Sequence, residues 1–160
     1  MSNKIVYFAG AIRGDRSMEH VMLELVRYIQ AQGLKVLTEH VATADPVATL
    51  ATYLGKRKED LTAEDIETQD IAWLDTATHV IAEISGPSTG TGREVEYART
   101  KGQLGKTPAN VLCIYHDEHE YTATPMIRGM SPEKYPNVSV AKYHTTDEAK
   151  EIIKKFLQTE

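Results

Sequence analysis

The stretch Ser85-Gly-Pro-Ser-Thr-Gly-Thr-Gly-Arg-Glu94 combines glycines and hydroxyl side chains with a carboxylate at its end. It follows an apolar β-branched run, Thr78–Ile84, and precedes residues with helical spacing. A strand, a glycine-rich turn and a helix N-terminus direct several unpaired N–H groups at one point, where the helix dipole favours negative charge. We therefore expect either an anion-binding loop, with Glu94 in the first turn of the next helix, or an ordinary βα turn.

Two well-known nucleotide-binding motifs do not fit this stretch. It contains no Gly-Lys-Ser/Thr, so it is not a Walker A loop. Gly90 and Gly92 form G-x-G, but Val95 stands where the dinucleotide fingerprint has its third glycine. The loop therefore gives no support to nucleoside triphosphate hydrolysis or to dinucleotide binding.

Asp70 is a second carboxylate in an unusual position. The segment Thr62–Ala77 has helical spacing, and Asp70 falls on its apolar stripe, four residues after Ile66 and three before Trp73. An inward-facing carboxylate must be hydrogen-bonded, paired or functional, because desolvating an unpaired charge is very costly. Asp70 either caps a neighbouring loop from the edge of the stripe or shares a pocket with Glu94.

Two carboxylates beside an anion-binding loop suit N-glycosidic bond chemistry on a nucleotide. One carboxylate attacks or stabilises an oxocarbenium-like sugar, and the other manages protons. Tyr7, on the first predicted strand, can orient the attacking carboxylate. A core tyrosine with a satisfied O–H explains its position equally well.

The apolar pattern predicts the elements that must position these groups. Strands are expected at 4–9, 35–38, 78–84, 110–115 and 138–143, and helices around 21–29, 62–77, 95–102 and 152–157. Gly33 and Gly102 are expected helix stops, and Thr62 with Asp65 resembles a capping box. The segment 42–61 has no clear pattern, and 116–137 is a long loop, which signals function or disorder.

Strands that alternate with helices imply right-handed crossovers and a parallel sheet covered on both faces. We therefore predict an α/β fold with a five-stranded parallel sheet, in a single domain over residues 1–160. Ligands of such sheets bind at the carboxyl ends of the strands, near the topological switch point. The turn after the first strand and the loop after Ile84 would both lie there.

Composition excludes several classes of protein. The net charge of −5 and pI near 5.7 argue against binding to a nucleic-acid polymer, which requires clustered Lys and Arg. The single cysteine, Cys113, lies in a predicted buried strand, so a disulfide framework is excluded and the thiol is expected to be a small buried hydrophobe. No signal peptide or membrane-length apolar run is seen, so we expect a cytoplasmic protein without a membrane partner.

Other polar clusters carry weaker indications. His116–Glu120 contains possible metal ligands, but they lack helical i, i+4 placement, so a solvated loop is favoured and no metal is predicted. Arg13 and Arg128 are each followed by glycine. Either can clamp a phosphate or be an exposed loop arginine.

Five ordered motifs of this chain resemble the 2'-deoxynucleoside 5'-monophosphate N-glycosidases, a hydrolytic branch of the nucleoside 2-deoxyribosyltransferase superfamily. The motifs are Val6–Gly14, Val36–Val41, Gln69-Asp70 with Trp73-Leu74, Pro87–Glu94 and Met126–Gly129. The similarity covers most of the chain, except the stretch 45–64. It implies a Rossmann-like (flavodoxin-like) three-layer fold, a homodimer or larger oligomer with its site near the subunit interface, and no cofactor.

The resemblance also implies residue roles. Glu94 looks like the nucleophile that forms a covalent deoxyribosyl intermediate, with Tyr7 beside it, and Asp70 like the carboxylate that contacts the sugar or leaving base and moves protons. The other residues implied to bind substrate are Gly10, Ile12, Arg13, Gly14, His40, Ser88 and Gly90, with Thr124 and Met126 contributed by the partner subunit.

Three positions depart from the family pattern. Ala11 stands where hydrolase relatives often have Ser, which removes one phosphate contact. Thr124 also replaces Ser but keeps the hydroxyl. Arg93, just before the expected nucleophile, bears on base preference.

The expected substrate is a 2'-deoxynucleoside 5'-monophosphate, cleaved by water to free base and 2-deoxyribose 5-phosphate. Three charge-assisted hydrogen bonds of about 2 kcal/mol each would contribute roughly four powers of ten in affinity for the phosphate, which a nucleoside transferase does not need. Three alternatives stay open: base exchange between deoxynucleosides, a preference for ribonucleotides, and a nucleotide-binding module without catalysis.

Overall fold

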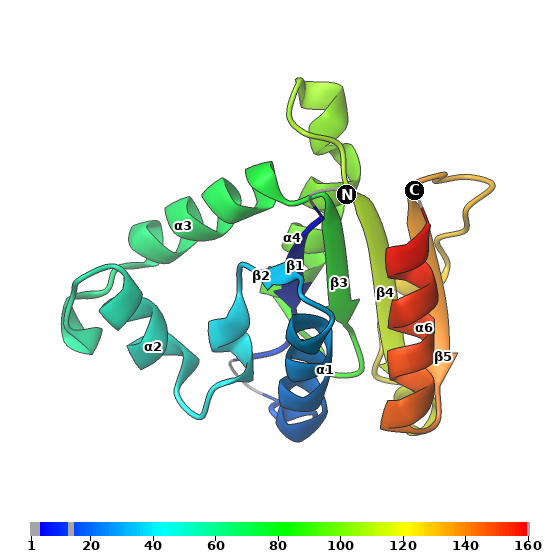
Figure 1. The fold of residues 1–160 in the computed structure, drawn as a ribbon, viewed down its shortest axis with the longest axis horizontal. Coiled ribbons are helices and arrows are strands. Elements are labelled where there is room, and N and C mark those ends of the chain that lie inside the picture. Colours follow the sequence, from blue (N-terminus) through cyan, green and yellow to red (C-terminus); the bar gives the residue numbers. More distant parts are fainter. Residues whose placement is uncertain (1–3, 13–14, 160) are drawn as a thin grey trace.

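The chain forms a five-stranded parallel sheet, which confirms the predicted α/β class. The computed structural model describes residues 4–12 and 15–159; Arg13 and Gly14 lie outside the described residues, so their expected roles have no structural test. The strands are β1 (Ile5–Ala9), β2 (Lys35–Val36), β3 (His79–Glu83), β4 (Asn110–His116) and β5 (Val138–Tyr143), in the order β2-β1-β3-β4-β5 (Figure 1). This is the flavodoxin-like order, and its switch point lies between β1 and β3.

Helices cover both faces of the sheet. Helices α1 (Glu19–Ala31) and α6 (Thr146–Gln158) lie on the face turned toward the viewer in Figure 1. Helices α3 (Ala63–Thr76), α4 (Thr89–Thr100) and α5 (Pro125–Arg128) pack on the opposite face. Within the described residues, no helix has the length and apolarity needed to cross a membrane.

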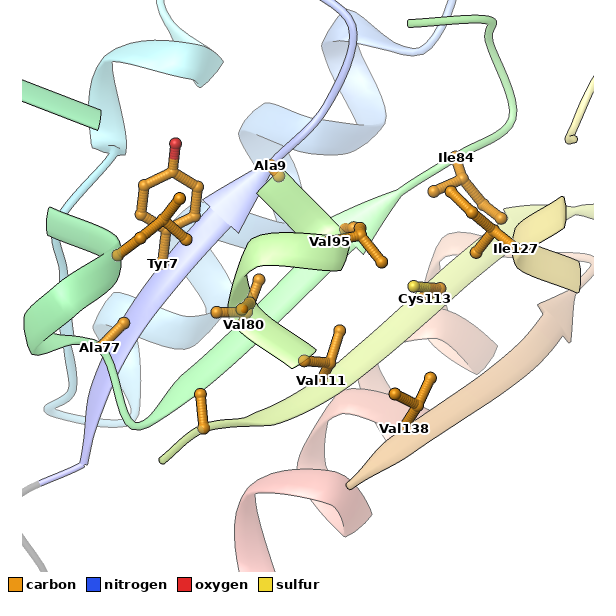
Figure 2. Packing of buried hydrophobic residues seen from close by; sticks show 14 of the residues in the cluster. Tyr7, Ala9, Ala77, Val80, Ile84, Val95, Val111, Cys113, Ile127 and Val138 are labelled. Atoms are coloured by element: carbon orange, nitrogen blue, oxygen red, sulfur yellow. The ribbon is translucent and has the colours of Figure 1, made fainter. Parts of the chain in front are cut away.

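The strands place alternate side chains in two separate cores, as the period of two requires. On β1, Val6 and Phe8 face α1 and α6, whereas Tyr7 and Ala9 face α3 and α4. Figure 2 shows the second of these layers, with Val95 of α4 lying over the side chains of the central strands. Tyr7 therefore belongs to the α3–α4 face because of its place in the strand alternation.

The predicted helix ends are partly right. Gly33 follows α1 at φ 77°, and Thr62 with Asp65 forms the expected capping box at the start of α3. Gly102 is not a helix stop, contrary to expectation. Helix α4 continues into the 3₁₀ turn η3 (Lys101–Leu104), and the left-handed residue that ends it is Gly105, at φ 77°.

The two stretches without a clear sequence pattern contain short helices. The first holds η1 (Glu39–Ala42), α2 (Pro46–Tyr53) and η2 (Lys58–Asp60). The second holds η4 (Asp117–His119) and α5, so the expected long loop is structured. Asp45 caps α2 and Thr124 caps α5, each directly before a proline at the first helical position. In both stretches the cap–proline pair is a sequence signal from which the helix could have been predicted.

Candidate active site

A cavity of about 430 Å³ opens at the carboxyl ends of β1 and β3, where the sequence analysis expects a ligand. The predicted site residues that line it are Tyr7, Gly10, Ile12, His40, Asp70, Ser88, Gly90 and Glu94. They come from β1, η1, α3 and α4, so the fold gathers segments separated by more than eighty residues. Asp70 is in the cavity with Glu94, which favours the shared-pocket interpretation over loop capping.

Tyr7 and Glu94 are joined directly. The Tyr7 hydroxyl donates a hydrogen bond to Glu94 Oε1 at 2.9 Å. Tyr7 is 1% exposed and its ring is packed in the α3–α4 core (Figure 2). Its side chain also lines the cavity. Tyr7 is thus a core aromatic whose O–H partner is the candidate nucleophile.

Helix α4 begins earlier than the glycine-rich stretch suggests. The Ser88 hydroxyl accepts a hydrogen bond from the Thr91 N–H at 3.2 Å and caps the helix, so Gly90 and Gly92 are helical. Glu94 consequently lies in the second turn of α4, and the prediction that it lies in the first turn is wrong. A serine N-cap was the overlooked signal, because Ser is among the strongest caps.

The N-terminus of α4 faces the same cavity. The intrahelical bonds begin with the Gly92 N–H to the Ser88 carbonyl at 3.1 Å, so the N–H groups of Thr89 and Gly90 precede that ladder. The helix dipole adds positive potential at this end. Backbone donors and dipole together make this end of the cavity suited to an anion, and Ser88 and Gly90 line it.

The two carboxylates interact strongly with each other. Burial and, second to it, the negative charge of Asp70 together raise the pKa of Glu94 to about 8, although the hydrogen bond from Tyr7 and the charge of Arg93 lower it. Burial, followed by the charges of Glu94 and Asp70, also raises the pKa of Tyr7 well above its usual range. A pKa of about 8 means that the Glu94 carboxyl group is largely protonated at neutral pH.

His40 forms a neutral part of the cavity wall. Burial lowers the pKa of its imidazole to about 4, so the ring is uncharged at neutral pH. Its centroid lies 5.4 Å from that of Trp73, whose other neighbour is the Tyr53 ring at 5.2 Å. A neutral imidazole suits hydrogen bonding to an uncharged base or sugar hydroxyl.

Eight residues that line the cavity were not among the predicted site residues, and Thr38, Ile66 and Thr91 are three of them. Thr38 Oγ1 accepts from the Phe8 N–H at 2.7 Å and donates to the Phe8 carbonyl at 2.6 Å, which fixes the end of β1. Thr91 Oγ1 is buried and has no hydrogen-bond partner within the described ranges. Neither residue carried a distinctive sequence signal, because threonine is common in strands and first helical turns.

A smaller apolar cavity of about 200 Å³ adjoins the carboxylates. It shares Asp70 and Glu94 with the main cavity and is otherwise lined largely by α3. Arg93 Nη2 and Glu67 Oε1 form an ion pair of 2.8 Å between residues that line this side cavity. Arg93, which departs from the family pattern, therefore borders the space beside the reacting groups.

Thr124, Met126 and Arg128 do not line the main cavity. Thr124 lines an adjacent cavity of about 260 Å³ on the flank of α4, and Met126 is 82% exposed. The Arg128 Nε donates to the Ala123 carbonyl at 2.8 Å, so this guanidinium supports its own loop. Of the two interpretations of Arg128, the phosphate clamp is not formed within this chain.

Comparisons with known proteins identify the family of this chain. The family model described as nucleoside 2-deoxyribosyltransferase matches residues 6–152. The 5-hydroxymethyl-dUMP N-hydrolase of Mus musculus is 37% identical over 126 residues, covering 78% of this chain and 64% of the mouse protein. The 5-hydroxymethyl-dUMP N-hydrolase of Danio rerio is 29% identical over 155 residues, and this alignment covers 96% of each of the two chains.

A solved structure supports the same fold. The CMP N-glycosidase of Clostridium botulinum superposes with a TM-score of 0.63 at 16% identity, covering 96% of this chain and 99% of that one. At this identity the likeness concerns the fold. Because the family model spans nearly the whole described chain, and four of the five predicted motifs contribute residues to one cavity, the chain belongs to the nucleoside 2-deoxyribosyltransferase family.

Proposed function

We propose that this protein hydrolyses the N-glycosidic bond of 2'-deoxynucleoside 5'-monophosphates, giving free base and 2-deoxyribose 5-phosphate. One observation carries the proposal: Glu94, hydrogen-bonded by Tyr7, shares a cavity with Asp70 and with the N-terminus of α4. The names of the curated relatives, which are N-hydrolases of deoxynucleoside monophosphates, support it. The cavity volume of about 430 Å³ is in the range of small-molecule sites.

The proposed reaction uses the proton on Glu94. The 5'-phosphate binds at the first-turn N–H groups of α4, which places the sugar over Glu94. The proton passes to Asp70, and the Glu94 carboxylate then attacks C1' of the sugar. The C1'–N bond breaks, a C1'–O bond to Glu94 forms, and Asp70 gives its proton to the leaving base.

The second half of the reaction restores the enzyme. Asp70, now a carboxylate, takes a proton from a water molecule that attacks C1' and displaces Glu94. Two displacements at one carbon retain its configuration. The hydrogen bond from Tyr7 stabilises Glu94 as a leaving carboxylate in this step and holds its orientation in the first.

Glu94→Gln is the direct test of this assignment. We expect it to lower turnover of a deoxynucleoside monophosphate by about a thousandfold or more, because it removes the nucleophile while keeping the side-chain shape. Glu96→Gln, two residues further along α4 with an exposed side chain, is the matched control and should leave turnover unchanged. Released base is measured by chromatography, and full turnover in the Glu94 variant would contradict the mechanism.

A substrate panel separates the proposal from its alternatives. We expect deoxynucleoside monophosphates to be cleaved faster than the same nucleosides without phosphate, and faster than ribonucleotides such as CMP. An added second base should not be incorporated into a new nucleotide. Incorporation would indicate a transferase, and calorimetric binding without cleavage would indicate a nucleotide sensor.

We further propose that the protein works as a homodimer whose partner subunit completes the site. The family resemblance implies this arrangement for Thr124 and Met126. Two exposed apolar side chains on the α5 flank, Met126 at 82% and Tyr121 at 99%, support it, because a subunit contact would bury them.

A further inference from the structure

A further cavity, of about 340 Å³, lies at the carboxyl ends of β4 and β5, on the face covered by α1 and α6. Four of the six histidines of the chain line it: His20, His116, His119 and His144. None of its lining residues lines the main cavity. The sequence analysis considered only the loop 116–120, whereas the fold adds His144 from the end of β5.

Three side chains in this region converge on one point. One possible ligand atom from each of His116, Asp117 and His144 lies within 4.8 Å of the others. Nδ1 of His144 is 2.8 Å from Asp117 Oδ2, and Nδ1 of His116 is 3.2 Å from Asp117 Oδ1. Ligands held at about 2.0–2.2 Å around a tetrahedral cation are roughly 3.3–3.6 Å apart, so small side-chain rotations suffice.

The contact between His116 and Asp117 brings two hydrogen-bond acceptors together. His116 Nδ1 accepts a hydrogen bond from the Glu118 N–H at 3.2 Å, so this nitrogen has no proton to donate to Asp117, and its lone pair would exchange the Glu118 N–H for a bound cation. Asp117 Oδ1 is shielded from solvent and has no hydrogen-bond partner in the part of the chain that the structure describes. Two acceptors 3.2 Å apart repel each other, and a cation between them would reverse that interaction.

The positions of these groups are set by the surrounding structure. The His116 ring packs edge-on against Tyr143, with centroids 5.3 Å apart and an interplanar angle of 88°. The backbone N–H of His116 donates to Ser85 Oγ at 2.9 Å, and the backbone N–H of His144 donates to Glu148 Oε2 at 2.8 Å. The ligand set is therefore largely preorganised on the ends of two neighbouring strands.

The donor set selects the kind of ion. Two imidazoles and one carboxylate suit Zn²⁺ and related transition metals, whereas Mg²⁺ and Ca²⁺ prefer oxygen ligands. An anion fits less well, because Asp117 would repel it. The N-terminus of α6, which borders the cavity, already has Asp147 and Glu148 in its first turn.

We propose that His116, Asp117 and His144 bind a transition-metal cation of the Zn²⁺ type, with His119 or water as the fourth ligand. The ion would connect the start of the β4–α5 segment to the β5–α6 junction. That segment leads to α5, which carries Met126, so the proposed ion would have a structural role. The proposed site is distinct from the catalytic cavity, because the two share no lining residue.

Titration of the untagged, chelator-treated protein with Zn²⁺ alone tests the proposal, by calorimetry and by competition with a metal-binding dye. We expect one site of micromolar or tighter affinity, weakened about a hundredfold or more in His144→Ala and in Asp117→Asn. Asp147→Asn removes a neighbouring exposed charge that is no ligand, and it should bind as the wild type does. Zn²⁺ at about a hundred times its Kd should raise Tm by roughly 5 °C, and Mg²⁺ should not.

Two results would overturn the inference. One is wild-type binding that saturates only near millimolar Zn²⁺; the other is equal affinity in the wild type and both ligand variants. His144 is largely exposed, so its replacement is not expected to prevent folding. Because no lining residue is shared with the catalytic cavity, loss of Zn²⁺ binding and loss of nucleotide cleavage are separately observable.

Discussion

At the scale of single residues, the pKa of Glu94 results from opposing effects. Burial and the charge of Asp70 raise its pKa, whereas the hydrogen bond from Tyr7 lowers it. The pKa of about 8 means that Glu94 is largely protonated at neutral pH. That proton is the one which the proposed reaction delivers to the leaving base.

The pH dependence of catalysis follows from this proton. We expect kcat/KM to fall as pH rises above about 8, because the pair then loses the proton that Asp70 must donate. Tyr7→Phe removes a hydrogen bond that lowers the Glu94 pKa, so the alkaline fall should move to higher pH. Initial rates between pH 5 and 10 measure both effects.

Asp70→Asn should change the profile in the opposite sense. Without the Asp70 charge the pKa of Glu94 falls, and the remaining reaction requires only that Glu94 be an ionised carboxylate. The variant should be slower by about a hundredfold or more and should lack the alkaline fall. A profile identical to that of the wild type would contradict the role of Asp70 in holding the proton.

The same shift predicts how stability depends on pH. The folded-state pKa of Glu94, about 8, lies above its ordinary value of 4.5. Protonated Glu94 therefore contributes to the free energy of unfolding fully below pH 4.5, and this contribution is lost as pH rises to about 8. Relative to the wild type, Glu94→Gln should therefore gain on the order of 3 kcal/mol in free energy of unfolding between pH 4.5 and pH 8. Urea unfolding at several pH values tests this, and a constant difference would refute it.

At the scale of elements, the start of α4 decides the shape of the anion-binding end. Ser88 caps the helix, and the glycines that follow are helical. The sequence pattern suggested a longer loop because glycine is a poor helix former. The cap, together with packing of Val95 and Ala98 in the α3–α4 core, outweighs that preference.

Two glycines, one near the start of α4 and one after η3, should change stability in opposite directions when replaced by alanine. Gly92 is helical and a Cβ would meet nothing within 4 Å, so Gly92→Ala should stabilise the protein by about 0.5–1 kcal/mol. Gly105 has φ 77°, so Gly105→Ala should destabilise it by about 1–2 kcal/mol although its surroundings are equally open. Denaturant midpoints of the two variants measure the contrast, and a like sign for both would contradict it.

At the scale of the whole molecule, we propose that a second chain completes the site. Thr124 lies outside the main cavity of its own chain, although the family resemblance places it at the phosphate of the partner's site. A mixing experiment distinguishes the two arrangements, because each chain of a heterodimer can supply what the other lacks.

We expect Glu94→Gln and Thr124→Val to be impaired separately and to complement each other when they are mixed. In the heterodimer one cavity keeps its own Glu94 and faces the wild-type Thr124 of the other chain. Random mixing should restore about a quarter of wild-type activity, since half of the dimers carry one intact site. If activity does not recover although mass spectrometry detects heterodimers, Thr124 does not act across the interface.

The sequence by itself determined the α/β class and the five strands and predicted Tyr7, Asp70 and Glu94 as candidate site residues, because strand alternation, helical spacing and turn chemistry are local properties. It could not determine where α4 begins, since capping by Ser88 competes with two glycines and packing decides the outcome. Only the tertiary structure brought Asp70 of α3 beside Glu94 of α4, and His144 beside His116 and Asp117. Those neighbours depend on strand order and helix packing, which join segments far apart in the chain.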